Sequence, residues 1–320
     1  MRQLSIGWIS ILTAASVAAQ EPQCNTLDPN ATAACNTAVD AVKAFHPLAG
    51  LLVSGGNPVL GTAGALGGVG HLALTARVNF LKASLPNPDS ASQSSVPSSF
   101  DGVVPAPVVE GAVGLLRGIS GGLLAVDVLG SAVLLPTGAV AGLQVDSGAA
   151  HIGGVALGLG YGVRVGILKG AFPVPALSVS YMRRTLPRIQ YGRLGSVFGS
   201  GDQFEFDTDL KADNYRIEAG WGFGLLDLAA GLGVDRYAST AHIRFHDDPT
   251  LPATVRTVTL DLSNTRQVLF LNGGLSVGPV KLVGEVGYQT GKDQRLSTNF
   301  SDFDPKAGHV FGGIGLRFGF

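Results

Sequence analysis

The last stretch of the chain, Gly308 to Phe320, reads GHVFGGIGLRFGF and decides the fold class. Successive side chains of a β-strand point to opposite sides, so the even positions of this stretch share one face and the odd positions share the other. The even face is apolar and ends in the aromatic Phe318 and Phe320, whereas the odd face is mostly small or charged. This alternation predicts a strand with one face in an apolar medium and the other toward a polar interior.

A strand that closes a chain on a terminal phenylalanine resembles the final strand of bacterial outer-membrane β-barrel proteins. The resemblance covers the stretch from Gly308 to Phe320. It implies that Phe318 and Phe320 belong to the signal that the barrel-insertion machinery reads. It also implies a location in the bacterial outer membrane, with outer-membrane lipid and the insertion machinery as partners.

The composition of the chain agrees with a barrel. Of 320 residues, 46 are glycine and only 14% are charged. The longest apolar run after the N-terminal region, Gly121 to Leu135, contains Asp127 and stops at Pro136, so it is too short to cross a membrane as a helix. A closed barrel is then the main way for such a chain to reside in lipid. The net charge of −1 gives no electrostatic argument for nucleic-acid binding.

Residues 1–19 have the features of a secretory signal peptide: a positive charge near the start, an apolar middle and a small-residue cleavage site. We expect cleavage after Ala19. In an exported chain the two cysteines, Cys24 and Cys35, predict one disulfide. Two cysteines do not complete a metal site, and we expect neither a metal nor another cofactor.

Residues 20–66 differ in composition from the rest, and Thr37 to Phe45 has helical spacing. Two interpretations remain open: a periplasmic N-terminal segment, or a plug that enters the barrel lumen. Around Asn57-Pro58 the sequence resembles the region that leads into the barrel of outer-membrane long-chain fatty-acid transporters. That resemblance implies a plugged barrel that takes up hydrophobic molecules. Residues 51–66 could also add a pair of strands.

Residues 67–320 predict an all-β fold, a transmembrane antiparallel barrel of about ten strands within a range of about eight to fourteen. Short turns alternate with longer polar loops, as expected for periplasmic turns and extracellular loops. We expect a loop at 85–105, and a bulge or a membrane exit near Ser263. The expected strands are 69–83, 107–117, 122–135, 155–168, 174–192, 204–223, 226–246, 254–276, 280–291 and 308–320.

The strand from Val155 to Leu168 separates a barrel from a soluble sandwich. One of its faces is apolar, and the other carries a glycine at almost every second position together with Arg164. A sandwich would fill that face with larger apolar side chains. On the inner wall of a narrow barrel, glycines leave room for side chains from neighbouring and opposite strands.

Charged residues on the inner faces of the predicted strands are the candidate functional residues. Both signs are present, so we expect ion pairs in the lumen, which would close a narrow barrel if complete or line a pore if partial. The lumen-facing charges predicted are Arg77, Arg164, Arg216, Glu218, Asp227, Asp235, Lys281, Glu285 and Arg317.

Two motifs suggest catalysis only weakly. The sequence from Gly118 to Gly122 matches G-x-S-x-G with Ser120 at its centre, but it lies between two apolar strands instead of before a helix, so we interpret it as a turn. His242 and His246 share one face of a strand next to Asp247 and Asp248, yet four residues along a strand separate them too far for joint metal ligation. An outer-membrane hydrolase stays an alternative that would use the His242 region.

We therefore expect a non-catalytic outer-membrane barrel with a porin-like passive transport role or a structural role in the envelope. The alternatives are a plugged barrel for uptake of hydrophobic molecules and an outer-membrane hydrolase. A small or hydrophobic solute is the expected ligand of a transporting form.

Overall fold

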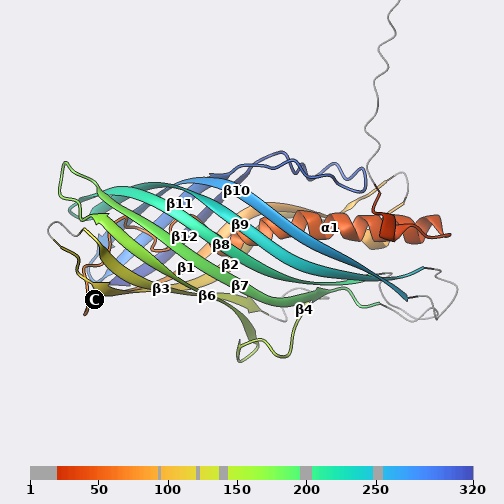
Figure 1. The fold of residues 1–320 in the computed structure, drawn as a ribbon, viewed down its shortest axis with the longest axis horizontal. Coiled ribbons are helices and arrows are strands. Elements are labelled where there is room, and N and C mark those ends of the chain that lie inside the picture. Colours follow the sequence, from red (N-terminus) through yellow and green to blue (C-terminus); the bar gives the residue numbers. More distant parts are fainter. Residues whose placement is uncertain are drawn as a thin grey trace, which may run out of the picture.

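The structure is a computed structural model that describes residues 20–92, 95–119, 123–136, 143–194, 204–247 and 255–319. The predicted signal peptide, Ser120 and Phe320 lie outside these ranges. Ten long strands form a closed antiparallel barrel, drawn from the side in Figure 1. They are β1 (Leu72–Pro86), β2 (Ser98–Leu116), β3 (Ala125–Pro136), β6 (Val155–Leu168), β7 (Ala176–Tyr191), β8 (Phe204–Phe223), β9 (Leu226–His246), β10 (Val255–Val277), β11 (Val280–Gln289) and β12 (His309–Gly319).

The ring closes between the first and the last strand. Strands β1 and β12 pair from Ala73 opposite Gly319 to Leu81 opposite Phe311. Each of the other long strands pairs with the long strands before and after it in the chain, so β3 pairs with β6. The two short strands between β3 and β6 are not part of the ring. They are β4 (Leu143–Val145), which pairs with the end of β7, and β5 (His151–Ile152), which pairs with the start of β6. The fold class predicted from the alternation is confirmed.

The two ends of the barrel differ. At one end, which we call the turn end, β8 and β9 are joined by residues 224–225 and β10 and β11 by residues 278–279, and β12 finishes there. At the opposite end, the loop end, the connections are longer, such as residues 290–308 between β11 and β12. The predicted alternation of short and long connections is confirmed. By the usual arrangement of such barrels, the turn end is periplasmic and the loop end extracellular.

The outer surface carries an apolar belt near the turn end. Leu74, Leu228 and Leu269 are exposed on the outside of β1, β9 and β10. Toward the loop end the same faces become polar, with Lys82 and Arg236 exposed. A band of outward apolar side chains bounded by charge is how a closed barrel meets lipid.

Aromatic side chains lie at the turn-end edge of this belt. Phe172 and Phe223 are exposed, and their ring centroids are 5.9 Å apart. Trp221 donates from Nε1 to the carbonyl of Pro173 at 2.9 Å. Phe318 lies at the same end on the outward face of β12, opposite Leu74. These positions are typical of an aromatic girdle at a membrane interface.

Two local expectations are wrong, and one alternative of a third is excluded. Residues 98–105 belong to β2 and not to a loop, because they pair with the long strand β1 up to Pro86. Residues 51–66 form no strand; they hold the end of a helix and an irregular segment. Of the two alternatives expected near Ser263, the bulge is excluded, because β10 pairs with β9 through that residue without a shift in register.

Candidate functional site: the lumen and the segment inside it

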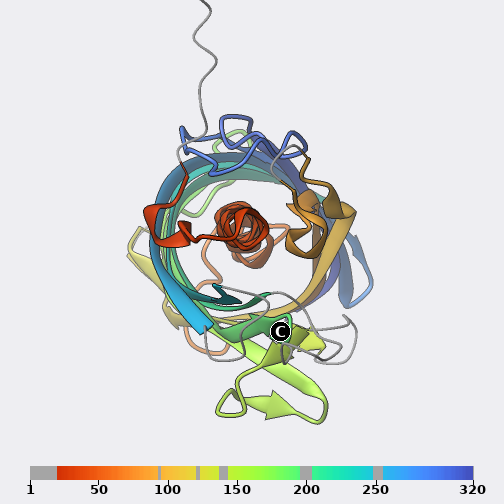
Figure 2. The same ribbon diagram turned by 90° about the vertical axis from the view of Figure 1, so that its right-hand side faces the viewer.

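Residues 20–66, which we call the lumen segment, run through the inside of the barrel. Their main element is α1 (Pro29–Ser54), which lies at the centre of the ring of strands when the barrel is seen from its loop end (Figure 2). The helix is buried on nearly every side. The segment enters at the loop end and leaves at the turn end, where residues 67–71 lead into β1.

Local sequence fixes both ends of the helix. The Asp28 side chain caps the start by accepting a hydrogen bond from the Asn30 N–H at 2.9 Å, and Pro29 follows it at a position where its missing N–H costs nothing. The helix stops at Gly55, whose φ of 57° favours glycine and whose N–H donates to the carbonyl of Leu51.

Small residues allow the helix to fit inside the barrel. The stretch from Ala31 to Ala44 is rich in alanine and is apolar around most of its circumference, as expected for a helix enclosed in a core. At Gly50 a Cβ atom would lie 2.6 Å from the ring of Tyr237 on β9. The helix and the wall therefore touch more closely than a larger side chain would permit.

The outer half of the lumen, toward the loop end, is apolar. Side chains from β8, β9 and β10 pack directly on the first turns of α1 and on the disulfide. The buried members of this cluster are Cys24, Cys35, Ala38, Val39, Val42, Phe204, Phe206, Ala241, Ile243, Phe245, Val258 and Leu260.

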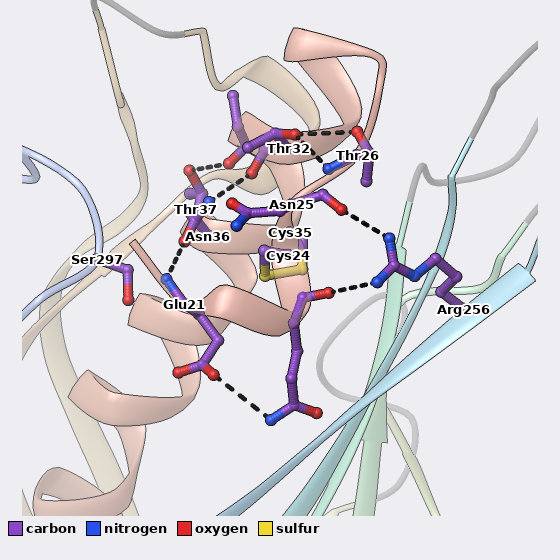
Figure 3. The surroundings of a disulfide bond; sticks show 12 residues. Glu21, Cys24, Asn25, Thr26, Thr32, Cys35, Asn36, Thr37, Arg256 and Ser297 are labelled. Carbon is purple, nitrogen blue, oxygen red and sulfur yellow. Dashed lines mark hydrogen bonds between the residues drawn. A yellow bond between two sulfur atoms is a disulfide. The ribbon is translucent and has the colours of Figure 1, made fainter. Parts of the chain in front are cut away.

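The predicted disulfide between Cys24 and Cys35 is confirmed, and it ties the 3₁₀ turn η1 (Pro22–Cys24) to α1 (Figure 3). Arg256, near the start of β10, donates to the carbonyls of Asn25 at 2.8 Å and Gln23 at 3.2 Å (Figure 3). The start of the lumen segment is therefore attached to the barrel wall at the loop end.

The loop between β11 and β12 fastens the middle of the helix. Asp40 accepts hydrogen bonds from the N–H groups of Ser297 at 2.6 Å and Thr298 at 2.7 Å. Pro47 lacks the N–H that would bond to the carbonyl of Lys43. The Gln294 side chain donates to that carbonyl at 3.2 Å instead.

His46 lies in the same part of the helix, against Ser239 of β9. Its Nδ1 is 2.7 Å from Ser239 Oγ, and its ring meets that of Tyr237 edge-on. Ser239 is closer to the loop end than Arg236 of the same strand, and Arg236, exposed on the outside, marks the end of the apolar belt. Burial, with a smaller contribution from the positive charge of Arg266, lowers the pKa of His46 to about 4.

The inner half of the lumen, toward the turn end, is ionic. Where α1 ends, Arg216 donates to the carbonyls of Gly56 at 2.8 Å and Gly55 at 2.9 Å. Arg77 donates to the carbonyl of Asn57 at 3.3 Å. Free carbonyls at a helix C-terminus carry partial negative charge, so these guanidinium groups bind where that charge is concentrated.

Carboxylates bind the N–H groups of the same turn. Glu285 accepts from the N–H of Gly56 at 3.1 Å and of Asn57 at 3.0 Å, and it forms an ion pair with Arg77 at 2.9 Å. Farther along, both oxygens of Asp127 accept from the N–H of Leu66. The irregular segment therefore has its backbone groups satisfied by charged side chains of the barrel wall.

The wall charges also pair with one another. Glu110 accepts from both Arg77 and Arg184 at 3.0 Å. Gly160 makes room for this network, because a Cβ there would lie 2.8 Å from Arg184 Cγ. The other buried pairs are Arg164 with Asp127 at 2.8 Å and Arg216 with Asp235 at 2.6 Å.

All nine predicted lumen charges lie on the inner faces of their strands. Arg317 donates to the carbonyl of Leu60 at 3.3 Å. Lys281 and Asp227 form a partly exposed ion pair near the turn end. Glu218 is 1% exposed, and neither of its oxygens has a hydrogen-bond partner among the described residues. The remaining five, Arg77, Arg164, Arg216, Asp235 and Glu285, belong to the pairs described above.

Four more buried charges of the barrel wall within the described residues were not predicted: Glu110, Asp127, Arg184 and Arg266. The signal for them was present, since each occupies the lumen face of its strand. Asp127 broke an apolar run, and Glu110 and Arg184 alternate with outward residues of β2 and β7. A systematic reading of every inner face would have found them.

The residues considered for catalysis or metal binding are not brought together. His242 is on the outside of β9, with Nδ1 at 3.0 Å from Asp207 of β8. Asp247 pairs with Arg256. Within the described ranges, no group of three His, Cys, Asp or Glu residues could hold a metal ion. In that part of the chain no helix is long and apolar enough to cross a membrane.

One pocket of about 300 Å³ opens at the turn end, where the lumen segment leaves the barrel. It lies between residues 62–65 and the turn between β6 and β7. Lys169, Phe172 and Trp221 contribute to its lining.

A closed antiparallel barrel with an apolar outer belt and a charged interior defines the class: a membrane-spanning β-barrel of the bacterial outer-membrane type. No known family model matches the chain, and no curated protein matches its sequence.

Solved barrels resemble the structure at low sequence identity. The outer-membrane protease OmpT from Escherichia coli is 12% identical, with a TM-score of 0.40, over 78% of this chain and 96% of that one. The translocator domain of autotransporter NalP from Neisseria meningitidis is 10% identical, with a TM-score of 0.39, over 78% and 88%. The toluene transporter TodX of P. putida is 9% identical, with a TM-score of 0.29, over 78% and 88%.

Proposed function

We propose that the lumen segment is a plug and that its displacement opens a path for small apolar or amphiphilic molecules across the outer membrane. One observation carries this proposal: the outer half of the lumen is lined by buried apolar side chains, including Phe204, Phe206 and Phe245. The interior of an open, water-filled porin is polar instead. Moving the helix outward would expose an apolar chamber at the loop end.

The contacts of the plug support a gated path over a permanently open pore. The helix covers the apolar wall with alanine and valine, and its C-terminal turn is bound by Arg77, Arg216 and Glu285. Ionic contacts of this kind break as water enters, because solvated charges lose little when they separate. The pocket beside residues 62–65 would then serve as the exit at the turn end.

A structural role in the envelope is the second candidate. The density of buried ion pairs around the plug favours it, since such a network can hold a barrel permanently shut. Both candidates are non-catalytic.

Uptake by intact cells distinguishes the two candidates. Gram-negative cells with and without the protein would be compared for entry of a small apolar fluorophore, which lipopolysaccharide slows, and of a charged fluorophore of similar size. The transport proposal predicts faster entry of the apolar probe alone, with a further increase for Glu285→Ala, which loosens the plug. Equal entry with and without the protein, for both probes and for the variant, would contradict transport and favour the structural role.

The matched control is Glu205→Ala. Glu205 pairs with Arg244 at 3.0 Å on the outside of β8, so the change removes a carboxylate of the same type without touching the plug. An increase in apolar uptake for Glu205→Ala equal to that for Glu285→Ala would show that the effect does not come from the lumen.

A further inference from the structure

Arg266, on the inner face of β10, is a buried guanidinium that forms no ion pair with any residue that the structure describes. It is 1% exposed, and its one hydrogen bond runs from Nη1 to the carbonyl of Thr290 at 3.2 Å. Its Nε and Nη2 atoms have no partner among the described residues. Burying an unpaired cation is strongly unfavourable, so an anion bound beside Arg266 would stabilise it.

The carboxylate opposite Arg266 is already saturated. Asp235 faces Arg266 in the register of β9 and β10. Its two oxygens accept from Asn214 at 2.6 Å, Arg216 at 2.6 Å, Tyr237 at 2.9 Å and Gln289 at 3.1 Å. Because these four donors occupy it, Asp235 leaves Arg266 unneutralised.

Two imidazoles near Arg266 also present free nitrogens. His46 comes from α1 and His309 from the start of β12, and the Nε2 atom of each is buried without a partner among the described residues. His309 lies opposite Gln289 in the pairing of β11 and β12, and Arg266 donates to the carbonyl of Thr290, the residue after Gln289. The ring of His46 meets that of Tyr237, two residues from Asp235, which is opposite Arg266. When the Ser239 hydroxyl donates to Nδ1 of His46, Nε2 of that ring carries the proton.

Another buried arginine of the barrel, Arg164, uses the same two nitrogens, Nε and Nη2, to bind a carboxylate. In Arg164, Nε and Nη2 both donate to one oxygen of Asp127, at 3.0 and 2.8 Å. The equivalent edge of Arg266 is free. This edge has the fork geometry that suits a carboxylate.

We propose that Arg266, His46 and His309 form a binding site for a carboxylate ligand between the plug helix and the barrel wall. The carboxylate would accept from Nε and Nη2 of Arg266 and from the two imidazole Nε2–H groups. It would link α1 to β10 and β12 and so help to hold the helix in place. The carboxylate belongs either to a free small acid or to the head group of an amphiphile. This site does not depend on the transport proposal.

The test is isothermal titration calorimetry on the full chain without its signal peptide, refolded in detergent in a buffer free of added carboxylates. Acetate and octanoate represent the two sources, and acetamide and octanamide are their neutral counterparts. We expect saturable binding of the acids and none of the amides. Binding should weaken at least tenfold in Arg266→Gln and stay unchanged in Arg236→Gln, which removes an exposed arginine on the outside of the neighbouring strand.

The outcomes distinguish an amphiphile head group from a free small acid, and both from the absence of a carboxylate site. Tighter binding of octanoate than of acetate in the wild type, absent in Arg266→Gln, assigns the site to an amphiphile head group, and the reverse order assigns it to a free small acid. Amide binding as tight as acid binding, or no saturable acid binding by the folded wild type, would overturn the proposal. If Arg266→Gln does not fold, His309→Phe replaces it and must weaken acid binding.

Discussion

The two halves of the lumen hold the same segment by different physical means. At the loop end, α1 and the disulfide pack on Ile243, Phe245 and other apolar side chains. At the turn end, the residues after Gly55 are held by Arg77, Arg216 and Glu285 through charged hydrogen bonds. Apolar contact is tolerant of sliding because it has no direction, whereas ionic contact fixes each backbone group at one place.

This difference suggests how a plug can be both secure and removable. The ionic half determines where the segment stops, and it is weakened when a single charge is removed, since each remaining charge then loses a partner in a buried site. The apolar half loses strength gradually as contact area decreases. We therefore expect substitutions in the inner half to have larger effects than matched ones in the outer half.

The largest effect is expected for Glu285→Ala. This change leaves Arg77 with one carboxylate partner and leaves the N–H groups of Gly56 and Asn57 without acceptors. Breaking a buried pair on one side costs about 3–5 kcal/mol in the free energy of unfolding. Urea unfolding of the refolded protein would measure it. Glu205→Ala on the outside should cost about 1 kcal/mol or less, and equal losses would remove the distinction between inner and outer charges.

Acidification should loosen the apolar half through His46. Its pKa in the folded state, about 4, lies below the ordinary value of 6.5. A lowered pKa means that the stability it contributes is complete above pH 6.5 and is lost as the pH falls from 6.5 to 4. The loss approaches about 3 kcal/mol at the lower end of that window.

Urea midpoints measured between pH 7 and pH 4 would show this dependence. The variant His46→Gln, which cannot take up a proton, should lose that part of the slope while other groups continue to titrate. A slope in His46→Gln identical to that of the wild type would exclude His46 as its source.

Removing the disulfide should have a somewhat smaller effect. The bond joins residues 11 apart, and closing a loop of this size contributes about 2–3 kcal/mol. The double change Cys24→Ser with Cys35→Ser should lower stability by that amount and expose the start of the segment to protease. The ionic contacts after Gly55 should persist, so apolar uptake should rise less than it does for Glu285→Ala. The opposite order would place the main hold at the loop end.

The smallest effect is expected for Ile243→Val in the outer half. Removing one buried methylene from a packed core costs about 1 kcal/mol. Urea unfolding should resolve this change with an unaltered m-value. A cost as large as that of Glu285→Ala would mean that the apolar half is the more tightly constrained one.

The barrel could be predicted from the sequence because its signal is local. Each strand alternates between lipid and lumen, and the ends of β6, β8 and β9 agree with the predicted ranges. The inner charges follow from the same alternation. Strand β2 was predicted too short, since the proline- and serine-rich stretch 85–105 indicates a loop locally, whereas pairing with β1 extends the strand back to Ser98.

The helix in the lumen was harder to predict. Helical spacing was visible only from Thr37 to Phe45, although α1 runs from Pro29 to Ser54. A helix surrounded by protein has no polar face, so the period that reveals a surface helix is weak. The contacts of Gly56 and Asn57 with Glu285 join residues more than two hundred positions apart, and no local pattern encodes them.

The central claim is that residues 20–66 close an otherwise open barrel. Single-channel conductance in planar bilayers tests it most directly, comparing the chain from residue 20 onward with a variant that lacks residues 20–66, each first shown to fold by heat-modifiable migration on a gel. We predict no steady conductance for the intact protein and steady conductance for the folded variant. Steady conductance of the intact protein, or a folded variant that stays silent, would contradict the account.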